Sequence, residues 1–334
     1  MPDHLTLGLA TVLAAGFFQG AFMAPSKWIR GWVWENYWLI FAATAYLLCP
    51  WILAALTIPG LFAIYARTSA EVLGTSFLFG TLWGLGAVTF GLGVDALGMA
   101  LGFAVILGVA TTAGTVVPLL VAPPPGWTTG DTVVTAAALA LLLAGVATCS
   151  LAGRWKEQTG SLSYGRGVLI CIVSGALSAC GNLGFAFGGE VTRHAQEAGI
   201  AAHVAPNALW TLLTLPLFFW NAGFAGWRLR RNGTARHYRE PGAGRSALLA
   251  MLMGAMWMAG IGLYGSGARR LGDLGPSLGW AILMSSMIVV ANFLGLATGE
   301  WKGAPRKNLL QLCVGAALLT VAIGLLGAVN ARRG

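Results

Sequence analysis

Long apolar stretches alternate along this chain with short polar connections. Ten of the stretches reach about 20 residues, the length that a helix needs to cross the hydrocarbon core of a bilayer. The connections leave no room for a separate soluble domain. The pattern therefore predicts an all-α integral membrane protein with ten transmembrane helices. The predicted spans cover residues 5–25, 37–58, 73–93, 99–122, 131–152, 167–188, 206–226, 246–267, 276–298 and 308–330.

One stretch of the chain is repeated 174 positions later without a gap. The recurring residues are Gly80, Trp83, Gly86, Gly91, Gly93, Leu97 and Gly98, matched by Gly254, Trp257, Gly260, Gly265, Gly267, Leu271 and Gly272. The first copy begins in span 3 and the second in span 8, so the repeating unit has five spans. Because five is odd, the second unit lies upside down relative to the first. We predict two inverted five-helix repeats, residues 1–152 and 153–334, in one compact membrane domain.

Composition and charge support the membrane assignment. The chain is 57% hydrophobic and 9% charged, against roughly 25% charged residues in soluble domains. Its net charge of +9 is concentrated in the connections that follow odd-numbered spans. Cytoplasmic loops carry such an excess, which predicts that these connections face the cytoplasm and both termini the periplasm. The charge therefore indicates a lipid bilayer rather than a nucleic acid as the partner.

A few polar side chains lie inside the apolar spans, where an unpaired amide or hydroxyl is costly. They are candidate substrate contacts, and hydrogen bonding between helices is an equally open interpretation. Pro50, Pro118 and Pro216 also fall inside spans and remove backbone donors there. The polar candidates are Gln19, Thr89, Asn182, Tyr264 and Asn292.

Aromatic side chains are the second component expected of a sugar site, since their faces match the apolar C–H surface of a sugar. The repeat places Trp83 and Trp257 at equivalent depths in spans 3 and 8. They are predicted to form opposite walls of a central cavity, with helix packing as the alternative. Trp210, Trp280 and Tyr264 are further candidates for the wall.

No acidic residue lies at the centre of a span, so proton coupling or gating must use groups near span ends. Glu35, at the start of span 2, is the first candidate, with Lys27 close by in the sequence. Its alternative role is a salt bridge that orients the first turn of span 2. Glu190 and Glu300, at the ends of spans 6 and 9, are candidate gates or relays, or solvated charges at helix ends.

Catalytic motifs do not stand out. The chain has no P-loop, no paired histidine ligands on a helix and no Gly-x-Ser-x-Gly elbow. We therefore expect a protein that is not an enzyme and that holds no metal or cofactor. A membrane enzyme would have to use Glu35 with Lys27 as its catalytic pair.

Several motifs resemble one known family. They are GFFQGAFMAPSKWIRGWVWE at 16–35, FLFGTLWGLG at 77–86, GLGVDALGMALG at 91–102 and Gly299-Glu300-Trp301. Together they resemble the L-rhamnose:proton symporter family of the drug/metabolite transporter superfamily. The resemblance implies ten helices in two inverted repeats and transport of a small neutral sugar with a proton. In the second half the chain has Gly260-Ile261-Gly262 where the family carries more aromatic and polar side chains.

The combined interpretation is a secondary transporter of the bacterial inner membrane. It imports L-rhamnose or a similar deoxyhexose with a proton by alternating access, with sodium as the alternative coupling ion, and it works as a monomer or a homodimer. Two other functions remain open. One is a carrier for another small metabolite of the superfamily, and the other is a membrane protein that binds a sugar without transporting it.

Overall fold

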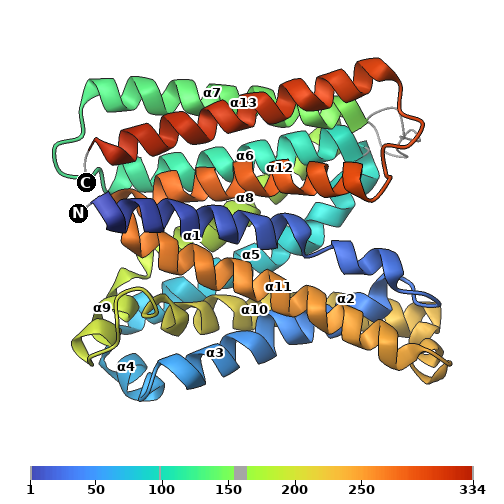
Figure 1. Ribbon diagram of the computed structural model, residues 1–334. Coiled ribbons are helices and arrows are strands. Elements are labelled where there is room, and N and C mark those ends of the chain that lie inside the picture. Colours follow the sequence, from blue (N-terminus) through green and yellow to red (C-terminus); the bar gives the residue numbers. More distant parts are fainter. Residues whose placement is uncertain (1, 98, 154–163, 333–334) are drawn as a thin grey trace.

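The computed structural model describes residues 2–97, 99–153 and 164–332. Within these residues it contains ten helical segments long and apolar enough to cross a membrane, which confirms the predicted number of spans. Most spans are single helices in Figure 1. The helices are α1 (Pro2–Ala21), α2 (Trp34–Ala42), α3 (Cys49–Thr57), α4 (Leu61–Arg67), α5 (Ala70–Leu97), α6 (Met99–Val121), α7 (Thr129–Gly153), α8 (Tyr164–Phe187), α9 (Gly189–Glu197), α10 (Pro206–Asn232), α11 (Ala243–Arg270), α12 (Trp280–Ala297) and α13 (Arg306–Ala331), with short turns η1 (Ala24–Trp28), η2 (Ala43–Leu48), η4 (Thr234–Arg239), η5 (Gly272–Leu274) and η6 (Gly275–Gly279).

Two spans differ from the continuous helices that the hydropathy pattern predicts. Span 2 contains the π-helical turn η2 between α2 and α3, where the Cys49 N–H bonds to the Thr44 carbonyl five residues earlier. Pro50 explains the break, because it has no N–H to donate to the Tyr46 carbonyl four residues before it. Span 9 begins with a second π-helical turn, η6, which contains Pro276. Hydropathy alone does not reveal such turns, because they leave the apolar composition unchanged.

The helices pack in pairs that an inverted repeat would produce. In one set of contacts between the halves, α5 packs against α8 and α10, and α8 packs against α6. In the corresponding set, α11 packs against α1 and against α2 with η2, and α1 packs against α12. These pairs correspond when each span is matched to the span five positions away in the chain. The fifth span of each half, α7 and α13, pack against each other at one edge of the bundle (Figure 1).

The repeated glycines make these contacts possible. A Cβ at Gly86 would lie 2.7 Å from the Ser178 backbone nitrogen of α8. Its counterpart Gly260 faces α1 in the same way, where a Cβ would lie 2.7 Å from Gln19 Nε2. Equivalent glycines thus bring equivalent helices together, which is consistent with the inverted repeat. Gly98, the last residue of the first copy, lies outside the described residues.

The bundle has two distinct ends. Its terminal end carries the start of α1, the end of α13 and the short helices α4 and α9 (Figure 1). The other end, which we call the loop end, carries η1, η4 and the connection between α12 and α13. The two termini share one end because the number of crossings is even. Arg154 and Lys156, which contribute to the predicted charge asymmetry, lie outside the described residues.

Candidate functional site

The two tryptophans of the repeat meet at the centre of the bundle. The ring centroids of Trp83 and Trp257 are 5.7 Å apart and the ring planes are tilted by 36°. Tyr46 of η2 lies edge-on to Trp257, with centroids 4.7 Å apart. Gln19 of α1 donates from Nε2 to the Trp257 carbonyl, at 2.8 Å. In this conformation the two tryptophans are therefore in contact with each other, and Gln19 joins them from a third helix.

Small residues make room for this aromatic cluster. A Cβ at Gly181 would lie 2.5 Å from the Trp83 ring, so the indole packs directly on the backbone of α8. A Cβ at Gly254, three residues before Trp257, would lie 2.9 Å from the Ala45 backbone nitrogen of η2. One glycine thus brings α8 against Trp83, and the other brings α11, which carries Trp257, against η2.

Several polar atoms around the pair have no partner. Within the described part of the chain no hydrogen bond is made by Trp83 Nε1, Trp257 Nε1, Gln19 Oε1 or the Tyr46 hydroxyl. Exposed fractions are 7% for Gln19 and Trp257 and 4% for Tyr46, Trp83 is partly buried, and the unpaired atoms of these residues remain accessible. Buried polar groups are usually paired. Three donors and two acceptors next to two indole faces therefore form a site suited to a small hydroxylated ligand. We call these four residues the central group.

Asn182 and Tyr264 form a second polar cluster, and its hydrogen bonds are satisfied. The Asn182 amide donates to the carbonyls of Gly114, at 2.8 Å, and Pro276, at 2.7 Å. Its Oδ1 accepts from the Tyr264 hydroxyl at 2.5 Å. Both side chains are fully buried. Asn182 therefore connects α8, α6, η6 and α11, and one of its two amide bonds occupies a carbonyl of the π-helical turn.

The remaining aromatic candidates surround Tyr264. Its ring centroid lies 5.8 Å from that of Trp280 and 6.3 Å from that of Trp210. Trp210 also stacks on Phe185, with centroids 5.0 Å apart and planes 3° from parallel. Trp280 packs on Gly114, where a Cβ would lie 2.5 Å from its indole nitrogen. These contacts are those of a packed core between α8, α10, α11 and α12.

Thr89 and Asn292 make bonds only within their own helices. Thr89 donates to the Leu85 carbonyl at 2.9 Å, and Asn292 donates to the Ile288 carbonyl at 2.8 Å. Such bonds satisfy a donor without help from another helix. The structure therefore does not bring these two candidates into contact with the central group.

Glu35 lies at the loop end, where it fastens α2 to the end of α10. Its side chain is 2% exposed and accepts hydrogen bonds from Asn232 Nδ2 at 2.7 Å and Thr234 Oγ1 at 3.1 Å. Arg228 Nε lies 3.7 Å from the second carboxylate oxygen, and its guanidinium carbon is 5.6 Å from the centroid of the Trp34 ring. The partner of Glu35 is thus Arg228, not Lys27.

Lys27 instead joins η1 to the end of α12. It forms an ion pair with Glu300 and a hydrogen bond to Thr298. The end of α12 positions Glu300: Gly299 has a φ of +79°, and the Glu300 N–H bonds to the Gly295 carbonyl at 2.9 Å. This is a Schellman motif, which favours glycine at the position with positive φ. We call the contacts of Glu35 and Lys27 together the loop-end clasp.

The terminal end has a corresponding set of contacts between the α4–α5 connection and α9. Glu190, His194 and Glu197 follow one another at helical spacing and so share one face of α9. The contacts join Arg67 Nη2 to Glu197 Oε2 at 3.3 Å, His194 Nδ1 to Thr68 Oγ1 at 3.1 Å, and the Ser69 N–H and hydroxyl to the Glu190 carboxylate at 2.7 and 2.8 Å. We call these three pairs the terminal-end clasp. Both ends of the bundle are therefore fastened in this conformation.

The predicted gating residues are thus distributed over the two ends of the bundle, and most of their partners were not among the residues that the sequence indicated. Tyr46 was not among them either, and Pro50, four residues later, is the one feature of the sequence that points to it. The helical spacing of Glu190, His194 and Glu197 could have indicated that these three side chains share one face of α9. No pattern in the sequence indicates that Arg228 faces Glu35, because this pairing depends on how α2 and α10 pack.

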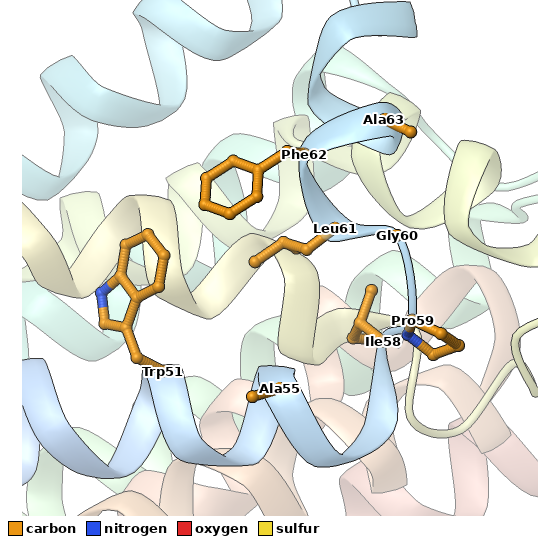
Figure 2. Close-up of a pocket in the computed structure, with 8 residues that line it drawn as sticks. All are labelled: Trp51, Ala55, Ile58, Pro59, Gly60, Leu61, Phe62 and Ala63. Carbon is orange, nitrogen blue, oxygen red and sulfur yellow. The ribbon is translucent and has the colours of Figure 1, made fainter.

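Two pockets at the periphery contain none of the predicted site residues. The first, of about 370 Å³, lies between α3 and α4 (Figure 2). Trp51 and Phe62 point towards each other across it, and Ile58 and Pro59 close one end. The second, of about 490 Å³, is lined by apolar residues of α6 with Thr112, and by Leu143 of α7. Neither offers the converging polar groups that a sugar requires.

Ten apolar spans make the chain a multi-pass membrane protein, and the family that it matches is one of transporters. A family model described as L-rhamnose-proton symport protein matches residues 1–226. The chain belongs to this family, which confirms the resemblance drawn from its motifs. It is 28% identical to the L-rhamnose-proton symporter of Cronobacter sakazakii over 98% of both chains. It is 26% identical to the symporters of the same name from Salmonella paratyphi A and Citrobacter koseri, again over 98% of each chain.

The satisfied bonds of the Asn182–Tyr264 cluster lead to a stability prediction. Replacing Tyr264→Phe keeps the ring but leaves the buried Asn182 Oδ1 without its donor. Bonds between membrane helices contribute about 1 kcal/mol, so the unfolding midpoint in detergent should fall by a few degrees. Tyr37→Phe is the matched control, because the half-buried Tyr37 hydroxyl has no hydrogen bond within the described residues. An unchanged midpoint together with weaker sugar binding in Tyr264→Phe would instead place Tyr264 among the substrate contacts.

Proposed function

We propose that this protein imports L-rhamnose, or a closely similar deoxyhexose, together with a proton by alternating access. The observation that carries the proposal is the central group, in which unpaired donors and acceptors lie beside two indole rings. L-rhamnose combines ring hydroxyls with an apolar methyl group, and these match the polar atoms and the aromatic faces respectively. The names of the relatives support the same substrate.

The membrane orientation proposed here follows from charge. Arg236 and Arg239 of η4 lie at the loop end, as do the basic residues of η1 and of the connection between α12 and α13. Basic loops favour the cytoplasmic side. The loop end would then face the cytoplasm, and the terminal end, with both termini, the periplasm. Inward movement of one positive charge with the sugar gains about 2.3 kcal/mol per 100 mV of membrane potential.

The two clasps suggest how access alternates. The Glu35 contacts of the loop-end clasp join the start of span 2 to the end of span 7, and its Lys27 contacts join the connection after span 1 to the end of span 9. The terminal-end clasp joins α9, after span 6, to the connection after span 2. Since spans 1 and 6, and spans 2 and 7, are equivalent in the repeat, the Glu35 contacts and the terminal-end clasp correspond to each other at opposite ends. Releasing one while the other holds would open the central group to one side at a time.

For the coupling ion we propose that protonation of Glu35 is linked to release of the loop-end clasp. Its nearly buried carboxylate accepts two hydrogen bonds and faces Arg228 at 3.7 Å. A proton would remove the charge that holds Arg228 and one of the acceptor sites. The contact between α2 and α10 would then weaken. The protonation state of Glu35 would therefore determine whether the loop end is closed.

Uptake of radiolabelled L-rhamnose into proteoliposomes tests the substrate. We expect accumulation by the wild-type chain and a KM raised about 10-fold or more in Gln19→Ala, since tenfold in affinity corresponds to 1.4 kcal/mol. Gln311→Ala, at an exposed glutamine of α13, is the control and should behave like the wild type. Sugar binding without uptake would indicate a non-transporting receptor. Neither binding nor uptake by a folded protein would contradict the proposed substrate.

A separate experiment tests the coupling. With an inward proton gradient, Glu35→Gln should lose accumulation of the sugar above equilibrium while it still exchanges labelled for unlabelled sugar across the membrane. The neutral amide can keep a hydrogen bond but carries no proton that dissociates. Glu240→Gln is the matched control, because Glu240 is a more exposed carboxylate in the connection between α10 and α11. Gradient-driven accumulation that survives in Glu35→Gln would assign the coupling to another group.

A further inference from the structure

We infer that Tyr46, which is presented by the π-helical turn of span 2, determines which sugar hydroxyl pattern the transporter accepts. The inference rests on the proposed function and extends it to a residue that no motif in the sequence indicates. It is carried by three observations, which concern the turn that holds Tyr46, the surface on which its ring packs and the state of its hydroxyl.

The first observation is the local backbone. Tyr46 lies within η2, in which the Cys49 N–H bonds to the Thr44 carbonyl instead of to the residue four positions back. Pro50 removes the N–H that a regular helix would direct to the Tyr46 carbonyl. Single π-helical turns of this kind are frequent at functional sites, because they change the direction of a side chain without ending the helix.

The second observation is the packing of the ring. Tyr46 lies edge-on to Trp257, with centroids 4.7 Å apart and planes at 83°, and edge-on to Phe41, with centroids 5.4 Å apart. Gly254 allows this approach, since a Cβ there would lie 2.7 Å from the Thr44 side chain. The ring is therefore packed on two sides and lies directly beside Trp257 of the Trp83–Trp257 pair.

The third observation is that the hydroxyl is free. Tyr46 is 4% exposed, its hydroxyl has no hydrogen bond within the described residues, and this oxygen remains accessible. The hydroxyls of the partly buried Tyr65 and the fully buried Tyr264 are both paired, with the Ala208 carbonyl at 2.6 Å and Asn182 Oδ1 at 2.5 Å. Buried tyrosine hydroxyls usually find a partner. A hydroxyl of a neutral sugar can supply it, either as donor or as acceptor.

The two halves of the protein are not equivalent at this point. Gly80, the counterpart of Gly254, faces α10, where a Cβ would meet the Leu213 backbone carbonyl and lie 2.7 Å from the Pro216 ring. The glycine of α11 thus approaches the turn that carries the Tyr46 hydroxyl, whereas its counterpart on α5 approaches α10, which contains no tyrosine. Such asymmetry can orient a ligand whose own hydroxyls are asymmetric, as those of a sugar are.

Uptake kinetics with monodeoxy analogues of L-rhamnose test the inference. Tyr46→Phe should raise KM for L-rhamnose about 3- to 10-fold, the range expected for one hydrogen bond. In the wild-type chain, one analogue should have a KM higher than that of L-rhamnose by a similar factor. In Tyr46→Phe, the KM values of this analogue and of L-rhamnose should be equal. Such non-additivity is the signature of a direct contact. Tyr37→Phe, at a half-buried tyrosine of the same span, should leave both KM values unchanged.

The unfolding midpoint of Tyr46→Phe is measured alongside and should equal that of the wild type, because the ring contacts are kept. Wild-type uptake of L-rhamnose with an unchanged KM in Tyr46→Phe would overturn the role of Tyr46 and leave the proposed function intact. An equal rise of KM for L-rhamnose and all analogues would also overturn it. If the wild-type chain took up no L-rhamnose, the proposed substrate would fail, and the assignment of Tyr46 with it.

Discussion

The need to pair polar groups inside the bilayer is the constraint on which the rest of this structure depends. Water is absent from the hydrocarbon core, so each buried amide, hydroxyl or indole N–H must find a partner within the protein or in a ligand. Asn182 and Tyr264 meet this requirement completely, and they hold four segments together. The polar atoms of the central group lack a protein partner but remain accessible, whereas the unpaired Trp210 Nε1 of the packed core is fully buried. Pairing and accessibility together therefore separate polar residues that stabilise the bundle from those available to a substrate.

The same constraint explains why the charged residues lie at the ends of the bundle. All the candidate gating carboxylates lie at the ends of the bundle, where water or cationic partners can stabilise them, and the centre contains neutral groups. A neutral sugar can therefore occupy the centre without meeting an uncompensated charge. The ends differ in burial: Glu35 is nearly inaccessible, whereas Glu300 retains 47% exposure in its pair with Lys27. A buried charge responds more strongly to the loss of its partner than an exposed one, which favours Glu35 as the controlling group at the loop end.

The sequence predicted the architecture because hydropathy and parity report on it directly. Ten apolar stretches and an odd repeat unit suffice for a ten-helix bundle with two related halves. The repeat also identified Trp83 and Trp257, which meet at the centre. Tyr46 could not be found in this way, because its importance depends on a turn caused by Pro50 and on the approach of Gly254 from a distant helix. Asn292 and Thr89 show the opposite case. The sequence indicated them as candidate contacts, but each forms its hydrogen bonds within its own helix.

The central claim is that the two clasps open alternately around the central group. Pulsed electron paramagnetic resonance distances test it most directly, using one pair of spin labels at each end: Ala66→Cys with Ala198→Cys, and Arg30→Cys with Lys302→Cys. The background should carry Cys313→Ser, since Cys313 is exposed. The account predicts that L-rhamnose and a change of pH shift the two distance distributions in opposite directions, so that one end lengthens while the other shortens. Distances that lengthen at both ends together, or that do not respond to either, would contradict it.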